Sequence, residues 1–246
     1  MLLLLTIMQV TGNKMQDTQD NNRFNRISIQ VSLSGYSFKV SDDAGAVKSS
    51  GWLTPDKVFT TEEFRRRYEF VEISLLSSKC ALVPILFFDS NSEREALRDV
   101  VSIGVDDEVR HIDIPEKAAV LVYSNSMGET LSTVISGMVL LTNGNSVPVL
   151  PELYFLIKDI DKCQDYNKIF ASYMDGFLHL VVAQGKTLLL ANIFQAQDFT
   201  TAEYFIFLAL KKLQLNPEVS TIVFRTPVSY DNEMSLYRYF RSVEVV

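Results

Sequence analysis

The 246-residue chain contains few of the residues on which most metal and catalytic sites depend. It has two histidines, His111 and His179, and two cysteines, Cys80 and Cys163, and the members of each pair lie far apart. Zinc sites and Ser-His-Asp triads need such residues in recognisable clusters, so the sequence predicts neither a metal site nor catalytic residues. Two cysteines without ligand spacing also favour a reducing compartment, and we expect a cytoplasmic protein.

Basic charge and glycine are also scarce. The net charge is −7, which argues against nucleic acid as the main partner, because binding phosphates needs clustered lysine and arginine. The ten glycines include no Gly-Gly pair, and the chain contains no glycine-rich phosphate loop of the Walker type. Hydrophobic residues make up 47% and charged residues 22%, a composition typical of a folded globular protein.

No hydrophobic run is long enough to span a membrane as a helix. The most apolar stretch, Met1–Val10, has ten residues and lacks the basic start of a signal peptide. We therefore expect residues 1–24 to form a flexible extension, or to result from a misassigned start codon. Export remains the alternative, and N-terminal sequencing of the mature chain would test it.

A repeated pattern dominates the rest of the chain. The sequence Phe59–Phe64 (FTTEEF) returns as Phe199–Tyr204 (FTTAEY), 140 residues later. Three further pairs of landmarks keep an offset of 140 or 141 residues: the turns Ser34-Gly35 and Asp175-Gly176, the glycines Gly45 and Gly185, and the strands predicted to start at Cys80 and Thr221. Self-similarity at a fixed offset indicates a duplicated structural unit.

Each copy predicts three meandering strands followed by a helix, a strand and a second helix. In the second copy, Asp-Gly between β-rich runs is a hairpin signal, and Thr200 with Glu203 predicts a capping box at the helix start. The first copy repeats this pattern, with Phe64, Tyr68 and Val71 at helical spacing. The predicted strands are 26–33, 36–41, 46–53, 80–88, 168–173, 177–184, 186–195 and 221–225, and the chain ends in a short β-rich run at 243–246.

The segment between the copies has a less regular pattern. Residues 118–123 predict a strand and residues 153–160 a helix, whereas 129–141 are compatible with either. We expect this segment to complete the first lobe and to cross to the second. The sequence therefore predicts an α/β protein built from two related units.

This element order resembles the duplicated ribonuclease-H-like unit of the actin-like ATPase superfamily. The run Asn192–Phe199 with the ending SLYRYFRSVEVV resembles one bacterial family of unknown function with that fold, distantly similar to PilM and FtsA. The resemblance covers residues 25 to 246. It implies two lobes, each with a mixed five-stranded sheet and helices, and a cleft between them. We expect the first lobe, with an insertion, over 25–163 and the second over 164–246.

The resemblance also implies where a nucleotide would bind. In that superfamily a hairpin turn from each lobe approaches the phosphates, and an Asp near each turn orients Mg²⁺-bound water. The matching positions here are two turns, and their residues are our candidates for phosphate contact: Ser32, Ser34, Gly35, Asp175 and Gly176. The first turn lacks the expected Asp. The Asp of the second directly precedes glycine, which is typical of a left-handed turn residue.

These departures favour a non-catalytic, degenerate actin-like protein that serves as a binding or assembly scaffold. We expect a protein partner and no cofactor, while the oligomeric state stays open. The alternative is a divergent ATPase or small-molecule kinase that binds Mg-ATP in the interlobe cleft. In that case Ser32, Ser34 and Asp175 would replace the usual groups.

Overall fold

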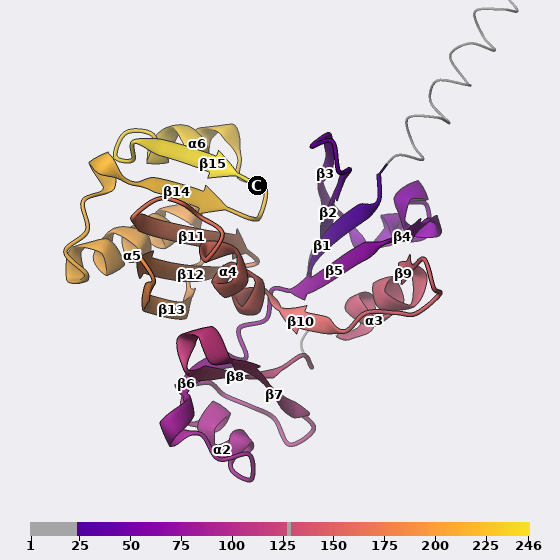
Figure 1. The fold of residues 1–246 in the computed structure, drawn as a ribbon, viewed down its shortest axis with the longest axis horizontal. Coiled ribbons are helices and arrows are strands. Elements are labelled where there is room, and N and C mark those ends of the chain that lie inside the picture. Colours follow the sequence, from indigo (N-terminus) through magenta and orange to yellow (C-terminus); the bar gives the residue numbers. More distant parts are fainter. Residues whose placement is uncertain (1–23, 127–128) are drawn as a thin grey trace, which may run out of the picture.

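The computed structural model describes residues 24–126 and 129–246, which form two lobes and a smaller inserted sheet (Figure 1). The predicted N-terminal extension, 1–24, lies outside the described residues apart from Phe24. Within the described ranges, no helix is both long enough and apolar enough to cross a membrane.

The first lobe is built on a five-stranded mixed sheet. Its strands are β1 (Arg26–Ser32), β2 (Gly35–Ser41), β3 (Val47–Leu53), β5 (Phe70–Leu75) and β10 (Val149–Pro151), in the order β3-β2-β1-β5-β10. The first three strands form an antiparallel meander, and β5 pairs parallel with β1. Strand β10 then pairs parallel with β5.

The second lobe repeats this topology. Its strands are β11 (Asn167–Met174), β12 (Phe177–Gln184), β13 (Thr187–Gln195), β14 (Thr221–Phe224) and β15 (Ser242–Val245), in the order β13-β12-β11-β14-β15. Helix α5 (Phe199–Lys212) follows the meander, and α6 (Tyr230–Leu236) joins the last two strands. The prediction of two mixed five-stranded sheets is confirmed.

One landmark of the predicted repeat is wrong. The counterpart of β14 is β5, because each pairs parallel with the first strand of its own sheet. The strand that starts at Cys80 instead belongs to a separate three-stranded sheet with the order β6-β8-β7. This sheet and its helix form the insertion, whose elements are β6 (Cys80–Pro84), α2 (Glu93–Arg98), β7 (Val109–Ile114) and β8 (Ala119–Ser124).

The helix predicted around Phe64 in the first copy is also wrong. A 3₁₀ turn, Glu62–Arg65, is followed by the short strand β4 (Arg67–Tyr68), which pairs with β9 (Leu140–Leu141). Phe64 and Tyr68 are fully buried and fit the helical spacing, but β5 begins at Phe70, so no room remains for a helix. Helix α3 (Glu129–Met138) packs against this core instead.

Helix α5 forms as predicted, but Asp198 caps it instead of Thr200. The Asp198 carboxylate accepts a hydrogen bond of 2.7 Å from the Thr201 N–H, which satisfies one of the free donors at the helix start. The remaining short elements are 3₁₀ turns at Pro55–Lys57, Ile85–Phe87, Pro115–Lys117 and Pro217–Val219.

Helix α4 (Glu152–Ile160) links the lobes at the centre of the molecule (Figure 1). It leaves β10 of the first sheet and packs its apolar face, which includes Leu156, on Phe170 and Val223 of the second sheet. The insertion contributes Leu121 to the same cluster. The predicted boundary between residues 163 and 164 falls in the loop between α4 and β11.

Candidate functional site

The two turns predicted to approach phosphate face each other across the lobe junction. In the second turn, Asp175 and Gly176 have φ angles of 50° and 79°. Both central positions of a type I′ hairpin need positive φ, and Asp tolerates that conformation better than most residues. The backbone therefore confirms the prediction that Asp175 is the left-handed residue of the turn.

The carboxylate of Asp175 also reaches the first turn. Its Oδ2 accepts hydrogen bonds from the Ser32 hydroxyl and, at 2.9 Å, from the Ser34 N–H. Partial burial on its own would raise the pKa of Asp175. The hydrogen bonds from Ser32, Ser34 and the Leu33 backbone outweigh that effect and lower the pKa below its ordinary value. The structure thus brings Ser32, Ser34 and Asp175 together.

Gly35 lets the first turn pack closely against its neighbouring strand. A Cβ atom at this position would lie 2.0 Å from the carbonyl oxygen of Leu53. No Cβ can approach a backbone oxygen so closely, so the hairpin requires glycine here. Gly35 therefore fixes where Ser34 presents its N–H group.

A buried carboxylate, which the sequence analysis did not single out, lies at the start of α4. Glu152 is completely inaccessible to solvent. Its Oε1 accepts hydrogen bonds from the Gln30 amide at 3.0 Å and from the Ser172 hydroxyl at 2.7 Å. Because Gln30 lies on β1 and Ser172 on β11, this carboxylate joins the two sheets.

Arg225 provides the counter-charge for Glu152. Its Nη1 lies 3.2 Å from Glu152 Oε1, and its Nε lies 3.0 Å from Asp159 Oδ2. The guanidinium also stacks over the ring of Phe155, with 5.1 Å between its central carbon and the ring centroid. Breaking such a buried pair by removing one partner is costly, so these residues are expected to hold the lobes in one relative position.

His179 lies in the same buried region. Its Nε2 donates a hydrogen bond of 3.1 Å to the Ser77 carbonyl, whereas Nδ1 has no hydrogen-bond partner among the described residues. Burial lowers the pKa of His179, although Glu152 and the carbonyl groups of Ser77 and Ser172 act in the opposite direction. A neutral histidine with a structural role fits this environment.

A cleft of about 730 Å³ opens between the lobes beside this network. The first sheet contributes Ser28, Lys39 and Ser49 to its walls, and the second lobe contributes Val223 and Arg225. Its size lies within the range of small-molecule sites. In the ranges that the structure covers, no group of three or more His, Cys, Asp or Glu side chains is arranged to hold a metal ion.

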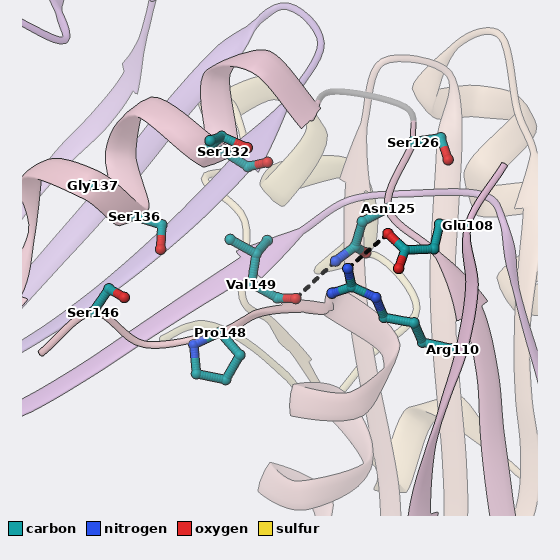
Figure 2. Close-up of a pocket in the computed structure, with 11 residues that line it drawn as sticks. Glu108, Arg110, Asn125, Ser126, Ser132, Ser136, Gly137, Ser146, Pro148 and Val149 are labelled. Carbon is teal, nitrogen blue, oxygen red and sulfur yellow. Dashed lines mark hydrogen bonds and ion pairs between the residues drawn. The ribbon is translucent and has the colours of Figure 1, made fainter. Parts of the chain in front are cut away.

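A second concavity, of about 400 Å³, lies between the insertion and the first lobe (Figure 2). Its walls come from β7, α3 and the segment before β10, and many of its side chains bear hydroxyl groups. The Asn125 amide donates a hydrogen bond of 2.8 Å to the Val149 carbonyl, while Arg110 pairs with Glu108 at 2.8 Å. The hydroxyl-bearing residues are Ser126, Ser132, Thr133, Ser136 and Ser146.

The sequence of the chain matches one protein family over residues 14–243. That family is described as "Protein of unknown function (DUF3822)". The chain belongs to this family. No curated protein matches the sequence of this chain.

Solved structures with similar folds share little sequence with the chain. A Bacteroides thetaiotaomicron protein with an actin-like ATPase fold and unknown function is 14% identical, with a TM-score of 0.61 over 93% of this chain and 92% of that one. A structure titled "PilM-PilN type IV pilus biogenesis complex" is also 14% identical, with a TM-score of 0.49 over 91% and 88%. The first likeness and the doubled sheet order establish the actin-like fold expected from the sequence.

Proposed function

We propose that this protein is a non-catalytic, degenerate actin-like protein that acts as a binding or assembly scaffold in the bacterial cytoplasm. One observation carries the proposal. The groups of the first turn that would contact a phosphate, the Ser32 hydroxyl and the Ser34 N–H, already bind the carboxylate of Asp175. The protein's own anion thus occupies the donors that a nucleotide would use.

Electrostatics makes simultaneous binding of a phosphate at these donors unfavourable. Two unit negative charges about 4 Å apart repel each other by about 4 kcal/mol at an effective dielectric constant of about 20. A phosphate would therefore have to displace Asp175 and separate the two turns. Phosphoryl transfer depends on positioning and on neutralising charge, and a second carboxylate at this place opposes both.

Exposed apolar side chains on the insertion support a protein partner. Leu86 and Phe87, in the 3₁₀ turn after β6, are 89% and 82% exposed. Large apolar and aromatic side chains that project from a small inserted sheet are suited to burial against another protein. The structure of the insertion therefore favours a role in binding.

Thermal unfolding in the presence of Mg-ATP tests the proposal. A ligand present at 100 times its dissociation constant stabilises a protein by about 2.7 kcal/mol. We expect no stabilisation at millimolar Mg-ATP relative to magnesium alone. Saturable stabilisation would overturn the proposal and support the alternative, a nucleotide-binding ATPase or kinase. Loss of that stabilisation in Asp175→Ala would then place the nucleotide at the two turns.

A further inference from the structure

Helices α5 and α6 leave large side chains exposed on the outer side of the second lobe. The two helices cover one face of the second sheet, with Ile206 and Leu236 fully buried against it, while α4 packs on the other face (Figure 1). On their solvent side, Tyr204 of α5 is 61% exposed and Tyr230 of α6 is 72% exposed. Tyrosine and methionine are enriched in protein interfaces, so their clustering here indicates a contact surface. We call this surface the aromatic face, and its exposed members are Tyr204, Tyr230, Met234, Tyr237 and Tyr239.

The aromatic face is continuous. Tyr230, Met234 and Tyr237 lie at i, i+4 and i+7 along α6 and therefore share one side of that helix. Tyr239 follows, and its ring packs edge-on against Phe207 of α5, with 4.9 Å between the ring centroids. Phe207 is one turn further along α5 than the exposed tyrosine of that helix. The exposed side chains therefore form one patch across both helices.

Two of these tyrosines are held in place before any partner binds. The Tyr237 hydroxyl donates a hydrogen bond of 2.9 Å to the Val243 carbonyl of β15. Tyr239 is held by its contact with Phe207. Side chains that are already ordered lose little conformational entropy in a complex, so these two are suited to anchor one.

The pairing of the strands fixes the direction of both helices. Strands β13, β11, β14 and β15 all point the same way, because β12 is antiparallel to both β11 and β13, and β14 is parallel to β11 and β15. Helix α5 joins β13 to β14, and α6 joins β14 to β15, so each helix runs back across the sheet against the strands. The two helices therefore begin at the same end of the lobe and finish at the opposite end.

Charge is separated along the aromatic face. The segments 195–210 and 226–237, which contain the starts of both helices, have no lysine or arginine. The acidic residues near the starts are Asp198, Glu203, Asp231 and Glu233, and the basic residues at the ends are Lys211, Lys212 and Arg238. Among the described residues, none of these side chains forms an ion pair. Glu218, in the turn after α5, reduces but does not cancel the positive charge of the basic end.

This arrangement is complementary to itself. A two-fold axis perpendicular to the aromatic face reverses the direction of the helices in a second copy, so the acidic helix starts of one copy face the basic helix ends of the other. The helix dipoles favour the same antiparallel arrangement. A purely acidic or purely basic partner would instead meet its own charge at one end of the face.

We propose that this protein forms a homodimer in which the aromatic faces of two copies pack against each other across a two-fold axis, with the helices antiparallel. The tyrosines form the centre of the contact, and the charges at the helix starts and ends form its rim. The inference goes beyond the proposed function, because neither a scaffold role nor the contact between the two turns requires a dimer. Absence of a dimer would leave the expected result with Mg-ATP unchanged.

Sedimentation equilibrium of the full chain at several concentrations tests the proposal. We expect the average mass to rise with concentration from that of one chain to that of two. Tyr204→Ser and Tyr230→Ser each change an exposed side chain and should each weaken the dimer by at least about 10-fold, because central aromatic side chains contribute strongly to an interface. Phe59→Ser changes a similarly exposed ring in the first lobe, so this matched control should dimerise like the wild type.

Charge reversal tests the direction of the helices. The double variant Lys211→Glu with Lys212→Glu should be monomeric at concentrations where the wild type is dimeric, because acidic helix starts then face acidic helix ends. Asp231→Lys with Glu233→Lys should be monomeric for the corresponding reason. An equimolar mixture of the two double variants should form the dimer again, because each reversed helix start then faces a reversed helix end.

Three results would overturn the proposal. The first is a wild-type chain that stays monomeric at every concentration. The second is a dimer whose dissociation constant is unchanged in the tyrosine and charge variants, since its contact would then lie on another surface. The third is a mixture of the two double variants that stays monomeric, which would refute the antiparallel arrangement.

Discussion

Replacing Asp175 by Asn tests the contact between the two turns. Asparagine keeps the shape of the side chain and tolerates the left-handed backbone at φ 50°, but it removes the negative charge. The change weakens the hydrogen bonds from Ser32 and Ser34. Hydrogen bonds to charged groups contribute about 1.5–3 kcal/mol each, and the exposure of Asp175 reduces this, so we expect a loss of about 1–2 kcal/mol.

Thermal unfolding measures this loss. For a chain of this length, 1 kcal/mol corresponds to about 2–4 °C, so Asp175→Asn should unfold about 2–8 °C below the wild type. Asp106→Asn is a matched control, because Asp106 is exposed and forms no hydrogen bond or ion pair with the described residues. A double-mutant cycle with Ser32→Ala should show coupling. Equal melting temperatures for the two asparagine variants, or strictly additive effects in the cycle, would refute the contact.

The pH dependence of the protein's stability tests the same contact independently. The pKa of Asp175 is lowered in the folded protein, so its stabilisation is fully present above the ordinary carboxyl pKa, about 3.9. It is lost as the pH falls through the lowered value. The stability difference between wild type and Asp175→Asn should therefore be constant from about pH 5 to neutral pH and decrease below about pH 4.

Three further predictions concern stability. Glu152→Ala leaves Arg225 without its fully buried partner and should lower the free energy of unfolding, measured with urea, by about 3–5 kcal/mol. The control Glu116→Ala changes an exposed side chain and should lower it by less than about 0.5 kcal/mol. Gly35→Ala should lower the melting temperature strongly, because the new Cβ atom would clash with the Leu53 carbonyl oxygen. Gly137 lies in helix α3 with open space around it, so Gly137→Ala should instead raise the free energy of unfolding by about 0.5–1 kcal/mol. Replacing exposed Phe87 by Ser should leave the free energy of unfolding within about 0.5 kcal/mol of wild type.

Each of these predictions has a result that would contradict it. A fully stable Glu152→Ala protein would show that the buried pair does not hold the lobes together. Equal effects of alanine at positions 35 and 137 would contradict the close approach of Gly35 to its neighbouring strand. A large loss at Phe87 would show that its side chain packs against the protein.

The second lobe could be predicted from sequence because its signals are local. Asp175-Gly176 and the glycine at 185 separate β-rich runs, and the structure places hairpins at both. In the first lobe the same approach failed at Phe64 and Tyr68. Their spacing fits a helix, but the start of β5 at Phe70 leaves the chain too short for one.

The candidate site could be predicted only in part. The two turns were identified from the repeat, but the contact between Ser32 and Asp175 spans 143 positions and leaves no local signal. Glu152 and Arg225 are single charged residues within apolar segments. Their pairing depends on how α4 crosses between the sheets, which no periodicity in the sequence encodes.

Titration of the Ser34 amide by NMR tests the central claim most directly, because this N–H group is the donor that either Asp175 or a phosphate would occupy. The account predicts that its chemical shift follows the protonation of Asp175 at acidic pH, that this change disappears in Asp175→Asn, and that millimolar Mg-ATP has no effect at neutral pH. An amide signal that ignores the titration of Asp175 but moves saturably with Mg-ATP would contradict the account.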